Sequence, residues 1–350
     1  MSGRIPKPVR GDSRPNKRGS RSPADPWELR EADYPERGSR VDKLRFLLRY
    51  AILAPSNRNA QPWSFTLSRD QISLHSDLSR WQRVSDPHAR ELHVSLGCAL
   101  ENFLIALEHF GFGHYVTLSP QAFDSSIVAQ IAILDRPAAS AFRPAALFKA
   151  IAERRTHHGR YQDRPVSAAA LRELAQCNVD RDLTLLLTEN PAIKDAAQKL
   201  MLKGEALGLS DAKYREELAE SIGSGNFGGP WLLSLAQQFA IAQLGMKAAD
   251  ARGGHKALAT SPVFGLISGA NVAEAGQMKA GQLLERLYLA ATARGLSLQP
   301  ISQLLEVDKV RVRFAKLFRA GGIPMVAFRL GYADRPVQPT PRRPLEEVLR

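Results

Sequence analysis

A short polar loop contains the side chains best suited to hold a flat heteroaromatic ring. It reads APSNRNAQPW from Ala54, and the hydrogen-bonding side chains of Ser56, Asn57 and Asn59 follow Pro55 directly. A few such groups at a fixed place can orient a ring that carries donors and acceptors on its edge. Serine and asparagine are also ordinary turn residues. From these residues alone, a ligand-binding loop and a capped turn are both open interpretations.

Two groups of basic residues lie far from this loop in the sequence. Arg154 and Arg155 precede Thr156 near the middle of the chain, and Arg342 and Arg343 lie close to its C-terminus. Guanidinium groups with a nearby hydroxyl suit a phosphate group. The alternative is structural, because arginines also cap helix ends and lie on solvated tails. A shared phosphate site would require a fold that brings both groups beside the polar loop.

The sequence around the polar loop indicates one unit of helices and strands. Apolar residues at helical spacing predict a helix from near Val41 to the loop. A long helix is expected to open at Asp86 and Pro87 and to run to about Gly111. Its apolar residues spread widely around the helix, so we expect burial on more than one face. The expected strands are 63–67, 72–75, 115–118 and 127–134.

A faint internal repeat suggests that the chain holds this unit twice. At a shift of 184 residues, the difference between positions 97 and 281, the matching pairs are Gly97 and Gly281, Leu100 and Leu284, Glu101 and Glu285, Ala106 and Ala290, and Gly111 and Gly295. The helix, loop and strand of 41–67 also have a counterpart at 167–187. We therefore expect an α+β fold of two pseudo-symmetric half-domains in one chain, 41–150 and 151–350.

The second half carries an insertion at about 190–276. It holds a long polar helix candidate and then the glycine-rich residues 223–230. Such joints suit a lid that closes over a pocket, although a passive connector has the same composition. Part of this run spells GxGxxG, but a polar helix precedes it and Pro230 follows, so a dinucleotide-binding turn is not predicted.

Composition and charge argue against several other classes of protein. The 350 residues carry a formal net charge of +13, and residues 1–21 hold seven basic residues and one acidic residue. We interpret 1–40 as a disordered basic tail; RNA contact is the alternative, but no aromatic residues interleave the charges, so nucleic acid is not an expected partner. No apolar run suits a membrane span or a signal peptide, which predicts a cytoplasmic protein. The two cysteines lack metal-binding spacing, so no metal is expected.

The polar loop closely resembles the flavin loop of the nitroreductase family, whose pattern APSxxNxQPW is followed by a strand. The wider layout, with Asp86 before a central helix, Arg154-Arg155-Thr156 at the midpoint and PRRPL from Pro341, resembles the Acg-type branch with fused halves. The resemblance covers about residues 41–350. It implies one FMN at the seam between the halves and a monomer that acts as a pseudo-dimer, with higher assembly possible.

The resemblance also assigns roles to particular residues. It implies that Pro55, Ser56, Asn57 and Asn59 face the flavin and that Gln61 and Trp63 brace them. The implied phosphate site consists of Arg154, Arg155, Thr156, Arg342 and Arg343. The implied turn beside the reactive ring nitrogen is Pro300, Ile301 and Ser302.

The sequence departs from the family pattern at two places. His158 stands where the family more often has lysine or arginine, so FMN affinity is expected to depend on pH around 6 to 7, unless Arg160 substitutes. The counterpart of the polar loop in the second half, near 176–179, lacks the motif. Only one of the two pseudo-equivalent sites is therefore expected to bind FMN.

The function that the resemblance implies is an FMN-dependent oxidoreductase. Electrons would pass from NADH or NADPH to a small electron-poor acceptor, such as a nitro compound or a quinone. The flavin would carry the chemistry, and no catalytic side chain is required. The alternative is an FMN storage or sequestration protein with a closed lid and little turnover.

Overall fold

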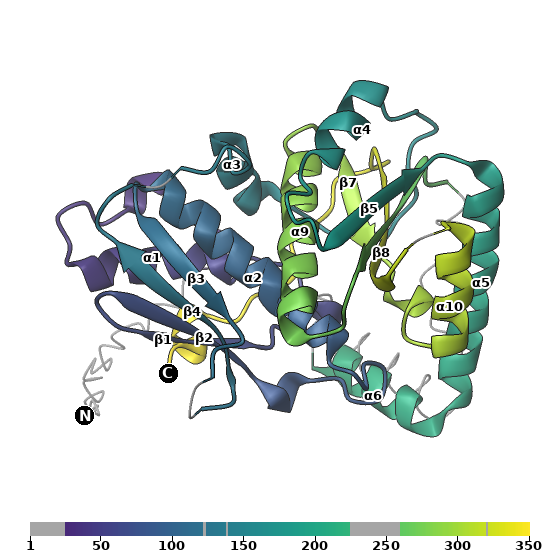
Figure 1. Ribbon diagram of the computed structural model, residues 1–350, viewed down its shortest axis with the longest axis horizontal. Helices are drawn as coiled ribbons and strands as arrows, with labels where there is room; N and C mark the ends of the chain where they lie inside the picture. Colours follow the sequence, from purple (N-terminus) through teal and green to yellow (C-terminus); the bar gives the residue numbers. More distant parts are fainter. Residues whose placement is uncertain (1–24, 122–123, 138, 225–259, 320) are drawn as a thin grey trace, which may run out of the picture.

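Two four-stranded antiparallel sheets with the same strand order organise the chain (Figure 1). The computed structural model describes residues 25–121, 124–137, 139–224, 260–319 and 321–350. The first sheet has the order β1-β2-β4-β3 and the second β5-β6-β8-β7. The matching orders confirm the expected α+β fold of two pseudo-symmetric halves.

The first half contains the helices α1 (Arg40–Ala51), α2 (Arg90–His109) and α3 (Ala145–Glu153). Its strands are β1 (Trp63–Leu67), β2 (Gln71–Ser76), β3 (Gly113–Leu118) and β4 (Ile127–Leu134). The short 3-10 helices are η1 (Glu31–Asp33), η2 (Asn57–Asn59) and η3 (Leu78–Arg80). The helices and strands expected in this half are therefore present.

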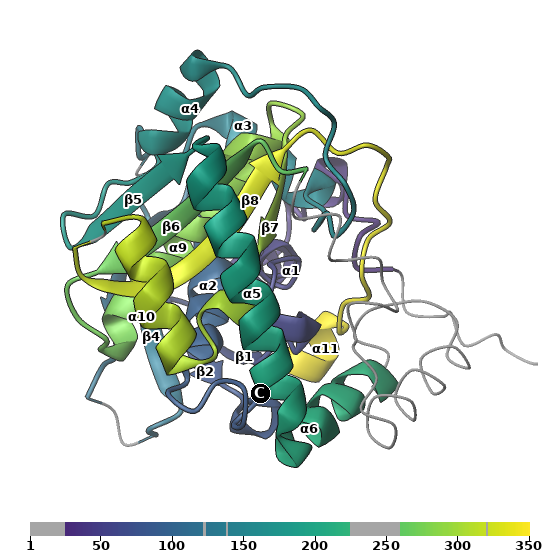
Figure 2. The same ribbon diagram turned by 90° about the vertical axis from the view of Figure 1, so that its right-hand side faces the viewer.

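The second half contains the helices α4 (Ala168–Ala175), α5 (Pro191–Ser210), α6 (Ala212–Gly223), α9 (Glu274–Thr292), α10 (Asp308–Leu317) and α11 (Leu345–Val348). Its strands are β5 (Leu183–Thr188), β6 (Val263–Gly269), β7 (Ser297–Pro300) and β8 (Ile323–Gly331), and η5 (Ser302–Leu304) follows β7. After β8 the chain returns to the first half, where Leu349 pairs with Phe65 of β1 (Figure 2).

Local sequence explains where the first two long helices begin. Ser39 caps α1, because its hydroxyl accepts from the Asp42 N–H and the Asp42 carboxylate accepts from the Ser39 N–H. The expected start of α2, with Asp86 as its N-cap, was three residues too early. The helix begins at Arg90 after Ala89, which has a left-handed φ of 53°. The Asp86 carboxylate lies outside the helix and accepts from the Leu92 N–H at 3.0 Å.

The two central helices α2 and α9 pack against each other between the sheets (Figure 1). A Cβ atom on Gly97 would lie 2.1 Å from the Met278 carbonyl oxygen, and one on Gly281 would lie 2.1 Å from the Val94 carbonyl oxygen. Positions 94 and 278 differ by the same 184 residues as the two glycines. The repeat register read from the sequence is therefore confirmed, and the pseudo-twofold axis passes between the glycines.

The insertion in the second half is shorter than expected. β6, expected to lie inside it, is a central strand of the second sheet and is buried throughout. This strand was missed because its residues VFGLISG do not alternate between polar and apolar types. The described part of the insertion is α5 and α6; residues 225–259, with most of the expected glycine-rich hinge and lid, lie outside the described residues.

The described chain also begins earlier than the expected tail boundary at residue 40. Leu29 is buried in the main core, and the Trp27 indole donates to the Thr340 carbonyl oxygen at 2.8 Å. The basic residues of 1–24 lie outside the described residues. None of the described helices has the length and apolar character that crossing a membrane requires.

Candidate functional site

A cavity of about 290 Å³ lies where the two halves meet. Most of the residues predicted for the site line it: Pro55, Ser56, Asn57, Asn59, Thr156, His158, Pro300, Ile301, Ser302 and Arg342. They come from the polar loop, the segment after α3, the end of β7 and the C-terminal segment. Arg154 lies buried next to this cavity, whereas Arg155 and Arg343 are directed elsewhere.

The polar loop has a strained backbone that side chains hold in place. Arg58, Asn59 and Gln61 have positive φ angles of 47°, 54° and 51°, a conformation that non-glycine residues adopt rarely. The Ser56 hydroxyl accepts from the Gln61 N–H at 2.9 Å. Asn59 Nδ2 donates to the Pro341 carbonyl oxygen at 2.9 Å. The loop is therefore a shaped element of the site, which favours a ligand loop over an ordinary turn.

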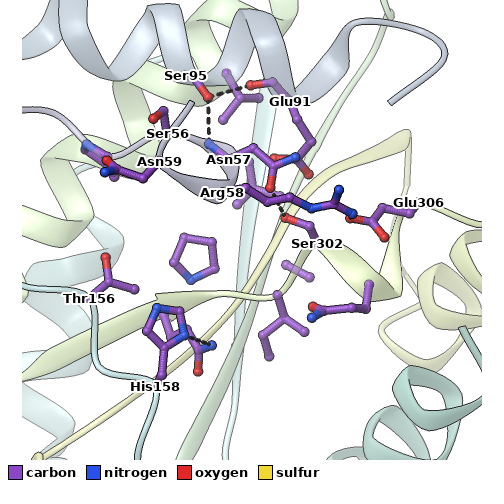
Figure 3. Close-up of a pocket in the computed structure, with 18 of the residues that line it drawn as sticks. Ser56, Asn57, Arg58, Asn59, Glu91, Ser95, Thr156, His158, Ser302 and Glu306 are labelled. Atoms are coloured by element: carbon purple, nitrogen blue, oxygen red, sulfur yellow. Dashed lines mark hydrogen bonds and ion pairs between the residues drawn. The ribbon is translucent and has the colours of Figure 1, made fainter. Parts of the chain in front are cut away.

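Asn57 connects three elements around the cavity. Its N–H donates to the Ser95 hydroxyl of α2 at 3.1 Å, and its Nδ2 donates to Gln82 at 2.9 Å. The Ser302 hydroxyl donates to Asn57 Oδ1 at 3.3 Å, across the seam between the halves (Figure 3). The neighbouring Ile301 N–H donates to the Ala327 carbonyl oxygen at 2.8 Å, so its hydrogen bond lies within the second half.

The basic end of the cavity is built from Arg154 and Arg342. Both guanidinium groups donate to the Leu53 carbonyl oxygen, at 3.3 Å and 3.2 Å. Arg342 Nη1 also donates to Asn59 Oδ1 at 2.9 Å. Arg154 Nη1 donates to the Thr156 hydroxyl at 3.3 Å. Burial and the adjacent Arg154 lower the pKa of Arg342, but a guanidinium remains charged in proteins.

The other two predicted arginines have structural contacts. Arg155 donates to the carbonyl oxygens of Ala152 and Arg154 at 2.8 Å. The Arg343 guanidinium donates to the carbonyl oxygens of Gln61 at 3.3 Å and Glu347 at 3.1 Å. The Arg343 N–H also donates to Gln61 Oε1 at 2.8 Å. Both residues therefore brace the surroundings of the site and do not line its cavity.

Trp27 supports the basic end from the N-terminal segment. Two guanidinium groups contact its ring, with the central carbon of Arg155 4.3 Å and that of Arg342 4.8 Å from the ring centroid. Cation–π contacts of this kind stabilise the position of a charged side chain. No sequence pattern indicated this contact, because Trp27 lies in the segment interpreted as tail.

Replacing Trp27 with alanine is expected to weaken ligand binding at the basic end by about fivefold, because Arg342 loses its cation–π contact with the ring. FMN titration of the apoprotein measures the effect. Deletion of residues 1–24 is the matched comparison, since it leaves Trp27 in place and should change affinity little. Unchanged affinity in Trp27→Ala would contradict a role for Trp27, and a loss confined to the deletion would assign the effect to the preceding basic residues.

His158 lies at the exposed edge of the same end (Figure 3). Its Nδ1 is 2.9 Å from Gln299 Nε2. The structure therefore places the predicted pH-sensitive residue at the cavity. Its effect on FMN affinity stays a prediction.

A buried ionic cluster at the opposite end was missed from the sequence. Arg58 lies between Glu217 of α6, at 3.3 Å, and Glu306, at 3.8 Å. The Tyr214 hydroxyl donates to Glu306 Oε2 at 2.9 Å. Burial raises the pKa of Glu306 and of Tyr214. Arg58 occupies one of the three unspecified positions of the loop motif, so the motif alone could not reveal it.

Glu217 attaches α6 to the first half. Its carboxylate accepts from the Val84 N–H at 2.8 Å, the Ser85 N–H at 3.1 Å and the Ser85 hydroxyl at 2.6 Å, besides Arg58. α5 and α6 also supply part of the cavity wall through Met201, Leu209 and Leu218. The described part of the insertion therefore forms a wall of the site.

Replacing Glu217 with alanine is expected to destabilise the protein by about 3 kcal/mol, because Arg58 loses one buried partner and the N–H groups of 84 and 85 lose their acceptor. Hydrogen exchange should accelerate most in 212–223. Glu216→Ala changes the exposed neighbour and serves as the control. Unchanged exchange in α6 would show that this carboxylate does not hold the helix.

Sequence comparison relates the chain to curated proteins over most of its length. It is 29% identical over 322 residues to a provisionally named NAD(P)H nitroreductase of Mycobacterium tuberculosis, covering 88% of this chain and 91% of that protein. It is 24% identical to PigM of a Serratia species, also provisionally named an NAD(P)H nitroreductase, covering 87% and 92%. No family model matches the chain.

The two-half fold and the similarity to these relatives extend over the same part of the chain. The chain is an α+β protein with two equivalent halves and a ligand-sized cavity at their seam. The relatives match both halves and are provisionally named NAD(P)H nitroreductases, so the chain is similar to nitroreductases over most of its length.

Solved structures give more distant overlaps. The FMN-dependent nitroreductase NfnB of Mycobacterium smegmatis, in complex with NADPH, is 18% identical with a TM-score of 0.39 and covers 59% of this chain and 97% of its own. A nitroreductase with bound FMN from Bacteroides fragilis is 13% identical with a TM-score of 0.35, covering 55% and 91%. The two-half architecture of this chain is established by the matching strand orders of its own two sheets.

Proposed function

We propose that this protein is an FMN-dependent oxidoreductase that passes electrons from NADH or NADPH to a small electron-poor acceptor, such as a nitro compound or a quinone. The observation that carries the proposal is the convergence of the polar loop, Thr156, Ser302 and Arg342 on one cavity between the halves. The names of the relatives support the same class of reaction.

The residues at the basic end fit the phosphate of FMN. Arg342 Nε is buried and makes no hydrogen bond among the described residues. Buried donors without acceptors are rare in proteins, and a phosphate oxygen is a strong acceptor for a guanidinium. The Thr156 hydroxyl lines the same end. We infer that Arg342 and Thr156 bind the phosphate and that Arg154 positions Thr156 by donating a hydrogen bond to its hydroxyl.

The middle of the cavity fits a flat ring system. Val94 and Leu284 of the central helices and Val326 and Ala327 of β8 supply apolar surface. Asn57 and the nearby Ser302 supply polar groups at the edge. Bound FMN would supply two-electron chemistry between the nicotinamide and the acceptor. The side chains named here bind it, orient its ring and exclude water from its buried face.

We also propose that the chain is an Acg-type monomer that acts in the cytoplasm. Its two half-domains, 41–150 and 151–350, imitate a dimer and together bind one FMN. The cavity wall formed by α5 and α6 gives the storage alternative a specific basis, since a wall over the ring restricts access.

An absorbance spectrum of the purified protein tests the proposal, repeated without oxygen after addition of NADH and then NADPH. Yellow flavin bands that bleach are the expected result. Bands that persist with both donors would favour storage. A colourless protein that takes up no added FMN would overturn the flavin assignment.

A further inference from the structure

Two equivalent buried glutamates differ sharply in their partners. Glu101 of α2 and Glu285 of α9 are related by the 184-residue shift, and both are fully buried. In a protein with two equivalent halves, such a pair provides an internal comparison. Each glutamate belongs to one of the two pseudo-equivalent regions beside the central helices.

Glu101 is fully paired. Arg143 donates to both of its carboxylate oxygens, at 2.8 Å and 3.0 Å, and Gln282 donates to Oε2 at 2.9 Å. Arg286 lies 3.2 Å from Oε1. Although burial acts to raise it, the pKa of Glu101 falls to about 2 because Arg286 and Arg143 stabilise the charged form. This region is a closed structural ion cluster.

Glu285 has no comparable partners. Neither of its carboxylate oxygens makes a hydrogen bond among the described residues. The nearest cationic atom is Arg154 Nε, 3.9 Å from Oε1. Burial raises the pKa of Glu285 to about 7, although Arg154 opposes the shift. Burial of a carboxyl group without a hydrogen-bond partner costs stability, so this group is a candidate for a functional role.

The charged and titratable groups near Glu285 lie on α2, on α9, directly after α3 and in the C-terminal segment. Arg154 and Arg342 attract its negative charge, whereas Glu101 of α2 repels it. The Asn102 amide, also on α2, has the smallest influence on the pKa of Glu285 and lowers it. Burial raises the pKa values of Cys98 on α2 and Tyr288 on α9, and the negative charge of Glu285 raises them further, so both side chains stay neutral. The only titration expected near neutral pH among these groups is that of Glu285.

The charge balance depends on whether an anion is present. Arg154 and Arg342 share the Leu53 carbonyl oxygen, so two positive charges are held close together beside one carboxyl group. Without an anion, ionised Glu285 offsets one of these charges. A phosphate dianion would offset both, and an ionised Glu285 would then repel it.

We propose that Glu285 is a positioning residue for the phosphate site: its carboxylate balances Arg154 and Arg342 when the site is empty, and it takes up a proton when a phosphate group binds. This inference rests on the proposed binding of FMN. The proton comes from solvent as the phosphate dianion arrives, so the cluster of two arginines, carboxyl and phosphate becomes neutral, whereas an ionised Glu285 would leave it with a net negative charge. No catalytic step is assigned to Glu285.

The proposal fixes the direction of a pH effect. Because binding takes up a proton, FMN affinity should fall as pH rises above about 7, by up to about tenfold per pH unit. The phosphate group itself titrates near pH 6, and histidine near 6.5, so both are largely deprotonated above pH 7.5. The range from there to pH 9 isolates the contribution of Glu285.

The test is an FMN titration of the apoprotein between pH 7.5 and 9, with calorimetry in two buffers of different ionisation enthalpy to count protons. The wild type should take up close to one proton per FMN at pH 8. Glu285→Gln should remove both the uptake and the pH dependence, while His158→Asn should keep them. Riboflavin, which lacks the phosphate, should bind without proton uptake.

The outcomes separate this inference from the proposed function. FMN binding with no proton uptake by the wild type would overturn the role of Glu285 and leave the flavin assignment intact, and this measurement needs no variant. The same uptake in Glu285→Gln would also overturn it. A protein that binds no FMN at any pH would overturn both.

Discussion

Replacement of Arg342 with alanine is expected to weaken FMN binding by roughly 100-fold or more, since hydrogen bonds from a charged group contribute about 1.5–3 kcal/mol each. The guanidinium lines the cavity and donates to Asn59 Oδ1 at 2.9 Å and to Thr340 Oγ1 at 2.7 Å. Its loss removes positive charge from the phosphate end and also releases the polar loop from the C-terminal segment. Quenching of flavin fluorescence during titration of the apoprotein measures the change.

Arg343→Ala is the matched control, because the adjacent guanidinium has its contacts outside the cavity. The Arg343 N–H that bonds Gln61 Oε1 is retained in this variant. Affinity should change by less than about threefold, as expected for a substitution away from a binding site. If both variants lost affinity equally, the assignment of Arg342 alone to the phosphate end would be wrong.

Gly97→Ala is expected to destabilise the protein by about 3 kcal/mol or more, at the upper end of overpacking effects. The added Cβ would lie 2.1 Å from the Met278 carbonyl oxygen and 3.0 Å from the Gly281 Cα. These are backbone atoms, so α2 and α9 would have to move apart. Urea denaturation followed by circular dichroism measures the loss.

Pseudo-symmetry supplies a second variant with the same expected effect. Gly281→Ala places its Cβ 2.1 Å from the Val94 carbonyl oxygen. Gly321→Ala, where a Cβ would meet nothing within 4 Å, is the control and should have little effect on stability. A Gly97→Ala protein as stable as this control would mean that the helices do not approach as closely as described.

Much of the fold could be predicted from the sequence because helix periodicity and the repeat depend on short-range patterns. The register of the two central helices was fixed by glycines that the close contact requires. β6 was not recognised, because a strand buried on both faces has no alternation to reveal it. The N-terminal segment was misassigned because charge in its first residues concealed the contacts of Trp27 and Leu29.

The site could be predicted only in part, for a related reason. A motif indicates which residues share a local element, and it placed the polar loop and Thr156 at the cavity. It could not separate Arg342 from Arg343, since the direction of each side chain depends on packing across the seam. The cluster of Arg58, Glu217 and Glu306 joins distant elements and has no local pattern.

The different environments of Glu101 and Glu285 also bear on how such a protein can change. In a symmetric homodimer one codon specifies both related positions, so any substitution alters two sites at once. In this chain the two positions are encoded separately, and each can accept a mutation without the other. One half can therefore accumulate changes that favour rigidity, while the other remains selected for its ligand.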